Sequence, residues 1–156
     1  MITRNDVTDA ASAAAARFLT PVVRSAQALA VNLKQAHWNV CGANFLAIHE
    51  LLDAVASNAR EAADLAAERV VALGLPIDAR LQTIADTVDF SEVAPGFSST
   101  EQTVRAAVQD IDDVRQRVAL AIAGLDGDDL PSQDVVIGIM ATLDRDRWLL
   151  AAHLSI

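Results

Sequence analysis

The sequence lacks the residues and runs that mark secreted and membrane proteins. Its one cysteine, Cys41, cannot form a disulfide within the chain and fits a reducing compartment. No uncharged run of about 18 apolar residues is present to form a transmembrane helix. The N-terminus carries acids and no long apolar stretch, unlike a signal peptide. We therefore expect a protein of the cytoplasm that does not enter a membrane.

Basic residues are also scarce and scattered. Lys34 is the only lysine, and the arginines stand among acids, as in Asp144-Arg145-Asp146-Arg147. The formal net charge is −9, and no basic run occurs. The electrostatic footprint of a nucleic-acid-binding protein is therefore missing. An acidic surface attracts cations instead.

The residues that are abundant favour helices. The chain has no tyrosine, four prolines and many Ala, Leu and Val residues, and Ala and Leu enter helices at little cost. Its 156 residues fit one domain, residues 1–156. Apolar periodicity predicts four long helices, over about residues 8–40, 45–73, 101–123 and from 131 almost to the end. The core stripe expected for the first helix is Leu19, Val22, Ala26, Leu29 and Leu33.

The breaks between these helices predict the topology. Gly42 is a candidate C-cap for the first helix, and Gly74 ends the second. Residues 75–99 form a long crossing connection with room for a short helix, and Thr100 and Thr103 are candidate caps for the next helix. Short, long and short connections predict an all-α, ferritin-like four-helix bundle with one crossover. Pro21 either opens a helix capped by Thr20 or kinks a longer one.

Chemistry-bearing side chains gather on the second predicted helix. His49 and Asp53 are four residues apart, and so are Asp64 and Glu68, so each pair shares a helix face. Asp53 and Asp64 are eleven residues apart, which is close to three turns at about 3.6 residues per turn. All four side chains therefore lie on one stripe. His37 ends the preceding helix, from which a short turn can bring it near His49.

The same spacing separates the two pairs along the helix. Eleven residues at about 1.5 Å each span roughly 16 Å. Metal–ligand bonds are only about 2.0–2.2 Å long, and the two metals of a dinuclear site lie about 3.5–4 Å apart. One chain therefore cannot put both pairs on the same ion. A two-fold axis that sets this helix antiparallel to its copy would do so, giving two identical sites per dimer.

Two imidazoles and three carboxylates suit iron, manganese or zinc, and open positions fit redox chemistry of iron. Two other interpretations compete with a metal site. His37 can be a satisfied core residue, and acids at four-residue spacing can be a solvated face. The segment from His49 to Asp53 also approaches the metalloprotease pattern H-E-x-x-H, but Asp53 replaces the second histidine, which argues against a protease.

Residues 34–45 (KQAHWNVCGANF), 48–53 (IHELLD) and 64–69 (DLAAER) closely resemble the Dps family of mini-ferritins. The resemblance implies a four-helix subunit that assembles twelve-fold into a hollow shell. It implies a ferroxidase site at each two-fold interface, with His37, His49 and Asp53 from one subunit and Asp64 and Glu68 from its mate. Family members oxidise Fe(II), typically with hydrogen peroxide, and store the ferric product inside, which protects against oxidative damage.

The resemblance also implies acidic pores for iron entry. The candidates surround the turn before the last helix, and their alternative role is an ordinary acidic turn at a helix N-terminus. These residues are Asp126, Asp128, Asp129 and Asp134.

DNA binding is the alternative function that the family implies, as a shell that protects the nucleoid. Members that bind DNA directly often use a lysine-rich terminal tail. The single lysine and the negative charge argue against direct DNA binding here. We still expect association with the nucleoid as a second location beside the cytoplasm. A third alternative for the function is a shell that kept its metal ligands but lost its activity.

Overall fold

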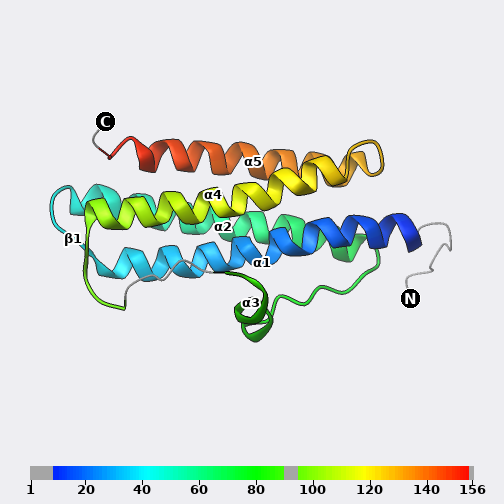
Figure 1. Cartoon of the computed structure of the whole chain (residues 1–156), viewed down its shortest axis with the longest axis horizontal. Helices are drawn as coiled ribbons and strands as arrows, with labels where there is room; N and C mark the ends of the chain where they lie inside the picture. Colours follow the sequence, from blue (N-terminus) through cyan, green and yellow to red (C-terminus); the bar gives the residue numbers. More distant parts are fainter. Residues whose placement is uncertain (1–8, 90–94, 155–156) are drawn as a thin grey trace.

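The computed structural model describes residues 9–89 and 95–154 and shows a bundle of four long helices (Figure 1). Helices α1 and α5 run in one direction and α2 and α4 in the other (Figure 1). α1 packs against α2 and α4, and α5 packs against the same two helices. The predicted all-α, ferritin-like bundle with one long crossover is confirmed. The long helices are α1 (Asp9–Asn39), α2 (Phe45–Ala72), α4 (Thr100–Gly124) and α5 (Leu130–Ala151).

The burial of residues in α1 explains why the apolar periodicity of the sequence predicted this helix. Every residue of its predicted stripe, from Leu19 to Leu33, is at most 2% exposed and belongs to the core. Pro21 lies inside α1, which continues without a break on both sides of it. No second helix therefore begins after Thr20, because the residues on either side of Pro21 pack into the same core. The alternative of a helix opened by Pro21 is wrong.

Two short strands that the sequence did not predict join the bundle at one end. β1 (Val40–Cys41) follows α1 directly, and β2 (Ser98–Ser99) precedes α4. They pair in parallel, with Val40 opposite Ser98. Gly42 lies after β1 with φ +110°, so it serves the turn into α2 rather than capping α1. This tight connection sets the end of α1 beside the start of α2.

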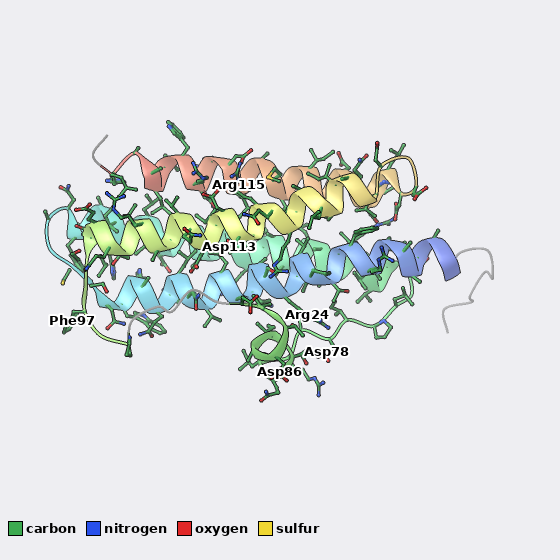
Figure 2. The ribbon with its side chains drawn as sticks, viewed as in Figure 1. Arg24, Asp78, Asp86, Phe97, Asp113 and Arg115 are labelled. Carbon is green, nitrogen blue, oxygen red and sulfur yellow. The ribbon has the colours of Figure 1, made fainter. Side chains whose placement is uncertain are left out.

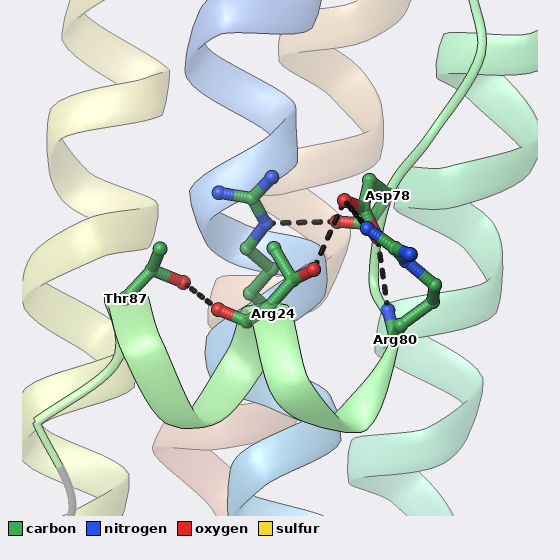
Figure 3. Close-up of polar contacts among 5 residues, drawn as sticks. Arg24, Asp78, Arg80 and Thr87 are labelled. Atoms are coloured by element: carbon green, nitrogen blue, oxygen red, sulfur yellow. Dashed lines mark hydrogen bonds and ion pairs between the residues drawn. The ribbon is translucent and has the colours of Figure 1, made fainter.

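The crossover contains the short helix for which the sequence left room, α3 (Leu81–Thr87). Asp78 fixes it to the bundle: its backbone carbonyl accepts a hydrogen bond from Arg24 of α1 at 2.9 Å (Figure 3). Its carboxylate accepts hydrogen bonds from Arg80 and Thr83 at 2.9 Å, and these bonds hold the pKa of Asp78 well below its usual range. Asp78 thus links the first turn of α3 to α1.

The later helices begin at side chains that cap them. Ser99 caps α4: its hydroxyl accepts from the backbone N–H of Gln102, whose side chain accepts from the backbone N–H of Ser99. The predicted caps Thr100 and Thr103 are wrong, because this reciprocal capping box satisfies the helix end one residue earlier. Asp129 caps α5, with Pro131 in its first turn as expected. Within residues 9–89 and 95–154, no helix has the length and apolar character needed to cross a membrane.

Candidate metal centre

The rings of the two candidate histidines lie face to face beside the short connection between α1 and α2. His37, in the last turn of α1, is 9% exposed, and His49 of α2 is half-buried. Their rings stack with centroids 3.7 Å apart and an angle of 21° between planes. Phe45 packs beside His49 at 5.1 Å between ring centroids. The short connection after β1 thus brings together two imidazoles that are twelve residues apart in the sequence.

Reciprocal hydrogen bonds fix the orientation of both rings. His37 Nδ1 lies 2.8 Å from the backbone oxygen of His49, and His49 Nδ1 lies 2.9 Å from the backbone oxygen of His37. A carbonyl oxygen only accepts, so each Nδ1 carries the proton and donates it. In the neutral ring, each Nε2 then keeps its lone pair, which is the form that binds a metal. The backbone therefore leaves the Nε2 atoms of both histidines able to bind a metal.

Asp53 lies one helical turn beyond His49 and is ion-paired. Lys34 Nζ donates to Asp53 Oδ1 at 2.6 Å, and this hydrogen bond lowers the pKa of Asp53 below its ordinary value. Lys34 also lies over the ring of Trp38, 5.8 Å from its centroid. The side chain of Asp53 is 56% exposed, so a cation from solvent can reach it. The sequence analysis missed this contact of Lys34 with Asp53. Lys34 stands three residues before His37, so the two share a face of α1, and this spacing is the signal that could have placed Lys34 near the site.

An open cavity of about 490 Å³ brings these groups to solvent. Its position at the surface means that an ion can enter without any helix moving. The cavity is lined by His37, Leu46, His49, Glu50, Asp53, Ala54 and Ser57.

The other predicted pair lies elsewhere on α2. Asp64 and Glu68 are exposed and do not line the cavity beside the histidines. Among the residues that the structure describes, no three His, Cys, Asp or Glu side chains are grouped so that they could hold a metal ion. The single chain therefore stacks His37 on His49 and places Asp53 in the lining of the same cavity, and it leaves Asp64 and Glu68 apart.

Large apolar side chains are exposed on the helices that carry these groups. Trp38 of α1 is 65% exposed, and Leu46 and Leu65 of α2 are 62% and 48% exposed. Exposed apolar surface of this kind is typical of contacts between proteins. Trp38 is not a core residue in the single chain.

Among the candidate pore residues around the turn before α5, Asp129 is partly buried and the other carboxylates are exposed. Burial raises the pKa of Asp129, but hydrogen bonds from Ser132 and Arg69 outweigh it, so the net pKa lies below the ordinary value. Asp129 thus caps α5 and pairs with Arg69 at 3.0 Å. The other three candidates, Asp126, Asp128 and Asp134, are exposed.

A buried acid in the last helix was not predicted from the sequence. Asp146 of α5 is 2% exposed, and Asn58 of α2 donates to both of its carboxylate oxygens at 2.9 Å. Burial raises the pKa of Asp146. The pair links α2 to α5 across the bundle, and nothing in the local sequence marks two residues 88 positions apart as partners.

Comparison with known proteins shows which family and which solved structures this chain is similar to. Residues 19–156 match the family described as Ferritin-like domain. A "DNA protection during starvation protein" of Agrobacterium fabrum is 30% identical over 98% of this chain and 95% of its own length. The high iron form of a Dps from Microbacterium arborescens is 55% identical, with a TM-score of 0.89 over 92% of this chain and 93% of that one. A Dps from Mycobacterium smegmatis in a tetragonal form is 27% identical, with a TM-score of 0.89 over 95% and 91%.

Proposed function

The chain belongs to the Dps family of ferritin-like proteins, and from this premise we propose that it oxidises Fe(II) and stores the ferric product. Membership of this family supports iron storage and protection from oxidative damage in broad terms. The finer proposal is a ferroxidase that uses hydrogen peroxide. The observation that carries it is the histidine pair, whose Nδ1 atoms are held by the backbone so that both Nε2 atoms are available.

The ligand set gives the chemistry. His37 and His49 supply nitrogen, and Asp53 supplies a carboxylate at the same open cavity. Carboxylates are hard ligands that favour Fe(III) over Fe(II), so binding helps the loss of an electron. Because Asp53 is held by Lys34, incoming Fe(II) takes the place of the ammonium on that oxygen.

A second copy of the chain completes the proposed site. Asp64 and Glu68 of a mate, related by a two-fold axis, approach the histidines of the first subunit. The exposed Trp38, Leu46 and Leu65 support this arrangement, since two such faces bury one another in an isologous contact. We propose a homo-oligomer of twelve subunits that encloses the mineral.

The proposed reaction consumes two toxic species together. Two Fe(II) ions each give one electron to one hydrogen peroxide, the O–O bond breaks, and two protons complete two waters, leaving two Fe(III). Because each peroxide takes both of its electrons at one site, from two Fe(II) ions, no hydroxyl radical is released. We also propose that Asp126, Asp128 and Asp134 guide Fe(II) inward, with Asp129 serving α5.

A stepwise oxidation assay tests the proposal. The protein is loaded anaerobically with Fe(II), peroxide is added, and Fe(III) absorbance is followed. We expect fast oxidation with one peroxide used per two Fe(II), and slow oxidation in a variant with both His37→Ala and His49→Ala. Size-exclusion chromatography confirms that the variant still assembles. Equal rates in variant and wild type would reject the site, and no Fe(III) signal in either would leave a shell without activity.

A DNA-protecting shell is the alternative function, favoured by the name of the Agrobacterium fabrum relative. The charge of −9 and the single lysine weigh against it. A gel-shift assay at low and moderate salt separates the two, because phosphate contacts weaken as salt rises. Salt-sensitive retardation without added divalent metal would favour DNA binding. We propose the cytoplasm as the location in either case.

A further inference from the structure

One face of α2 stays exposed along the whole length of the helix. Exposed side chains recur on it at steps of three or four residues, which is the period of a single helix face. It is the face on which a second copy of the chain is proposed to lie. Its exposed residues are Leu46, Glu50, Asp53, Ser57, Arg60, Asp64, Glu68 and Val71.

The proposed dimer determines which residues of the two α2 helices oppose one another. The helices are antiparallel, and Asp53 of one lies opposite the partner subunit's Asp64. Seven residues before Asp53, Leu46 then lies opposite the partner's Val71, seven residues after Asp64. Leu46 and Val71 are 62% and 52% exposed in the single chain. This register therefore covers an apolar side chain at each end of the paired helices.

The charge of this face opposes such a contact. Four of its eight residues are acids, and Arg60 is its one basic residue. Two copies that meet through it bring like charges together, which costs binding energy. Among the described residues of α2, the other arginine is Arg69, which is tied to Asp129 at 3.0 Å. Arg60 is therefore the arginine of α2 that is left to offset the acids.

Arg60 has no close partner within its own chain. It is exposed and forms no hydrogen bond or ion pair with the residues that the structure describes. Asp64 follows four residues later, a spacing that often joins charged side chains on a helix, yet the two do not pair. Arg115, in contrast, lies between α4 and α5 and pairs with Asp144 at 2.7 Å (Figure 2). The guanidinium of Arg60 is left for a group outside the chain.

Helix geometry directs Arg60 toward the shared site. Side chains lean toward the N-terminus of their helix, so Arg60 leans toward Ser57 and Asp53. The hydrogen bond from Lys34 lowers the pKa of Asp53 most, and the positive charge of Arg60 lowers it further. The partner subunit's Asp64 lies opposite Asp53 and leans back toward Arg60, because its helix runs the other way. The two side chains therefore approach one another.

We propose that Arg60 is a positioning residue of the shared metal site, a role that rests on the proposed function. Its guanidinium pairs with the partner subunit's Asp64 and holds that carboxylate beside His49 and Asp53 before metal arrives. Each dimer contains two such pairs, one at each site. A divalent cation that binds there neutralises the same carboxylates and replaces the contribution of Arg60 to the contact between subunits.

Dissociation on dilution, followed by size-exclusion chromatography in a fixed urea concentration, tests this role. In EDTA, we expect Arg60→Gln to raise the protein concentration of half-dissociation about tenfold, because each dimer loses two ion pairs. With Zn²⁺, a redox-inert probe, the variant should lie within about twofold of the wild type. Arg60→Lys keeps the charge and should recover most of the loss. A loss that is equal in EDTA and in Zn²⁺ would show a packing effect and would overturn the proposal.

Charge-reversed subunits distinguish a pair between subunits from a pair within one chain. Assembled alone, Arg60→Asp and Asp64→Arg each place like charges together, and we expect each to dissociate at about tenfold higher concentration in EDTA. A one-to-one mixture restores an acid–arginine pair at both sites of every mixed dimer, so half-dissociation should return to within about threefold of the wild type. A pair within one chain would give no recovery, which would overturn the proposal.

A second mixture controls for overall charge. Asp86→Arg makes the same charge change on α3, which packs against α1 and lies at the outer edge of the bundle (Figure 2). Mixed with subunits that carry Arg60→Asp, it should give no recovery. Recovery equal to that with Asp64→Arg would show a general charge effect and would overturn the proposal. Circular dichroism checks folding, and if a reversed variant does not fold, the comparison of Arg60→Gln in EDTA and in Zn²⁺ decides.

Failure of this role and failure of the proposed function give different results. Fe(II) oxidation is not measured in the dissociation assays, so a shell without activity would leave their outcome unchanged. If the site is not shared, subunits with altered histidines and subunits with altered Asp64 and Glu68 restore no oxidation when they are co-assembled. If only the role of Arg60 is wrong, that oxidation recovers, and Arg60→Gln dissociates like the wild type in EDTA.

Discussion

His37 and His49 each use one ring nitrogen to bind the backbone of the other, and this exchange fixes the orientation of both rings. The two bonds, 2.8 and 2.9 Å long, connect the end of α1 to the first turns of α2. The sequence predicted that the two rings would be near one another, because a short turn joins their helices. It could not predict the tautomer, because that depends on backbone oxygens whose positions only the folded turn determines.

The contact of Lys34 with Asp53 gives a prediction for metal affinity. The variant Lys34→Met removes an ammonium that competes with metal for the carboxylate and repels it. We expect Zn²⁺, used as a redox-inert probe, to bind about three- to tenfold more tightly by calorimetry. Lys34→Arg keeps the charge and is the control. Unchanged or weaker binding in Lys34→Met would show that Lys34 instead helps to position Asp53.

Asp129 gives a prediction for pH dependence. Its pKa is lowered in the folded chain by Ser132 and Arg69, so the ionised form stabilises the fold. That stability is present above the ordinary carboxyl pKa, near 3.9, and is lost as pH falls through the lower folded value. We expect Asp129→Asn to destabilise the protein at pH 7 and to match the wild type more closely below about pH 4.

Urea unfolding at several pH values measures this effect. The control is Asp128→Asn, since Asp128 is exposed and its carboxylate makes no hydrogen bond to the described residues. A stability difference between Asp129→Asn and wild type that stays constant with pH would contradict the role of the ionised cap.

At the scale of elements, the helices followed from periodicity, but their ends did not. The stripe from Leu19 to Leu33 predicted α1 because a buried helix face needs apolar residues every three or four positions. The start of α4 was misplaced because Ser99, Thr100 and Thr103 can all cap a helix by type. The choice among them depends on Gln102 reaching back to Ser99 and on β2, which pairs with a strand 58 residues earlier.

The capping box is tested by comparing two neighbouring substitutions. Ser99→Ala removes the hydroxyl that accepts from Gln102 N, so we expect a loss of about 1 kcal/mol in the free energy of unfolding. Thr100→Ala lies inside the first turn of α4 and should change the stability by less than half of that amount. Denaturant unfolding of both variants at equal protein concentration measures the difference. A larger loss of unfolding free energy for Thr100→Ala than for Ser99→Ala would indicate that Thr100 is the N-cap of α4.

At the scale of the whole molecule, the single chain holds only part of the proposed site. Asp64 and Glu68 share a helix with His49, yet rigid helix geometry keeps Asp64 roughly 16 Å from Asp53 along the axis, and Glu68 lies one turn farther. The spacing therefore predicts a partner subunit, and the exposed Trp38 and Leu46 provide a surface for one.

A complementation experiment tests the shared site most directly. Subunits carrying His37→Ala with His49→Ala are co-assembled, one to one, with subunits carrying Asp64→Ala with Glu68→Ala. Each variant alone is expected to be inactive. In a mixed dimer, one site receives intact histidines from one subunit and intact acids from the other, while the second site loses both.

Random pairing makes half of the dimers mixed, with one intact site in two, so we predict about a quarter of the wild-type rate of Fe(II) oxidation. Mass spectrometry of the assembled protein confirms that both subunits are present. A site built within one chain would give no recovery in the mixed assembly. Recovery to about a quarter supports a site shared between two subunits, and no recovery would contradict it.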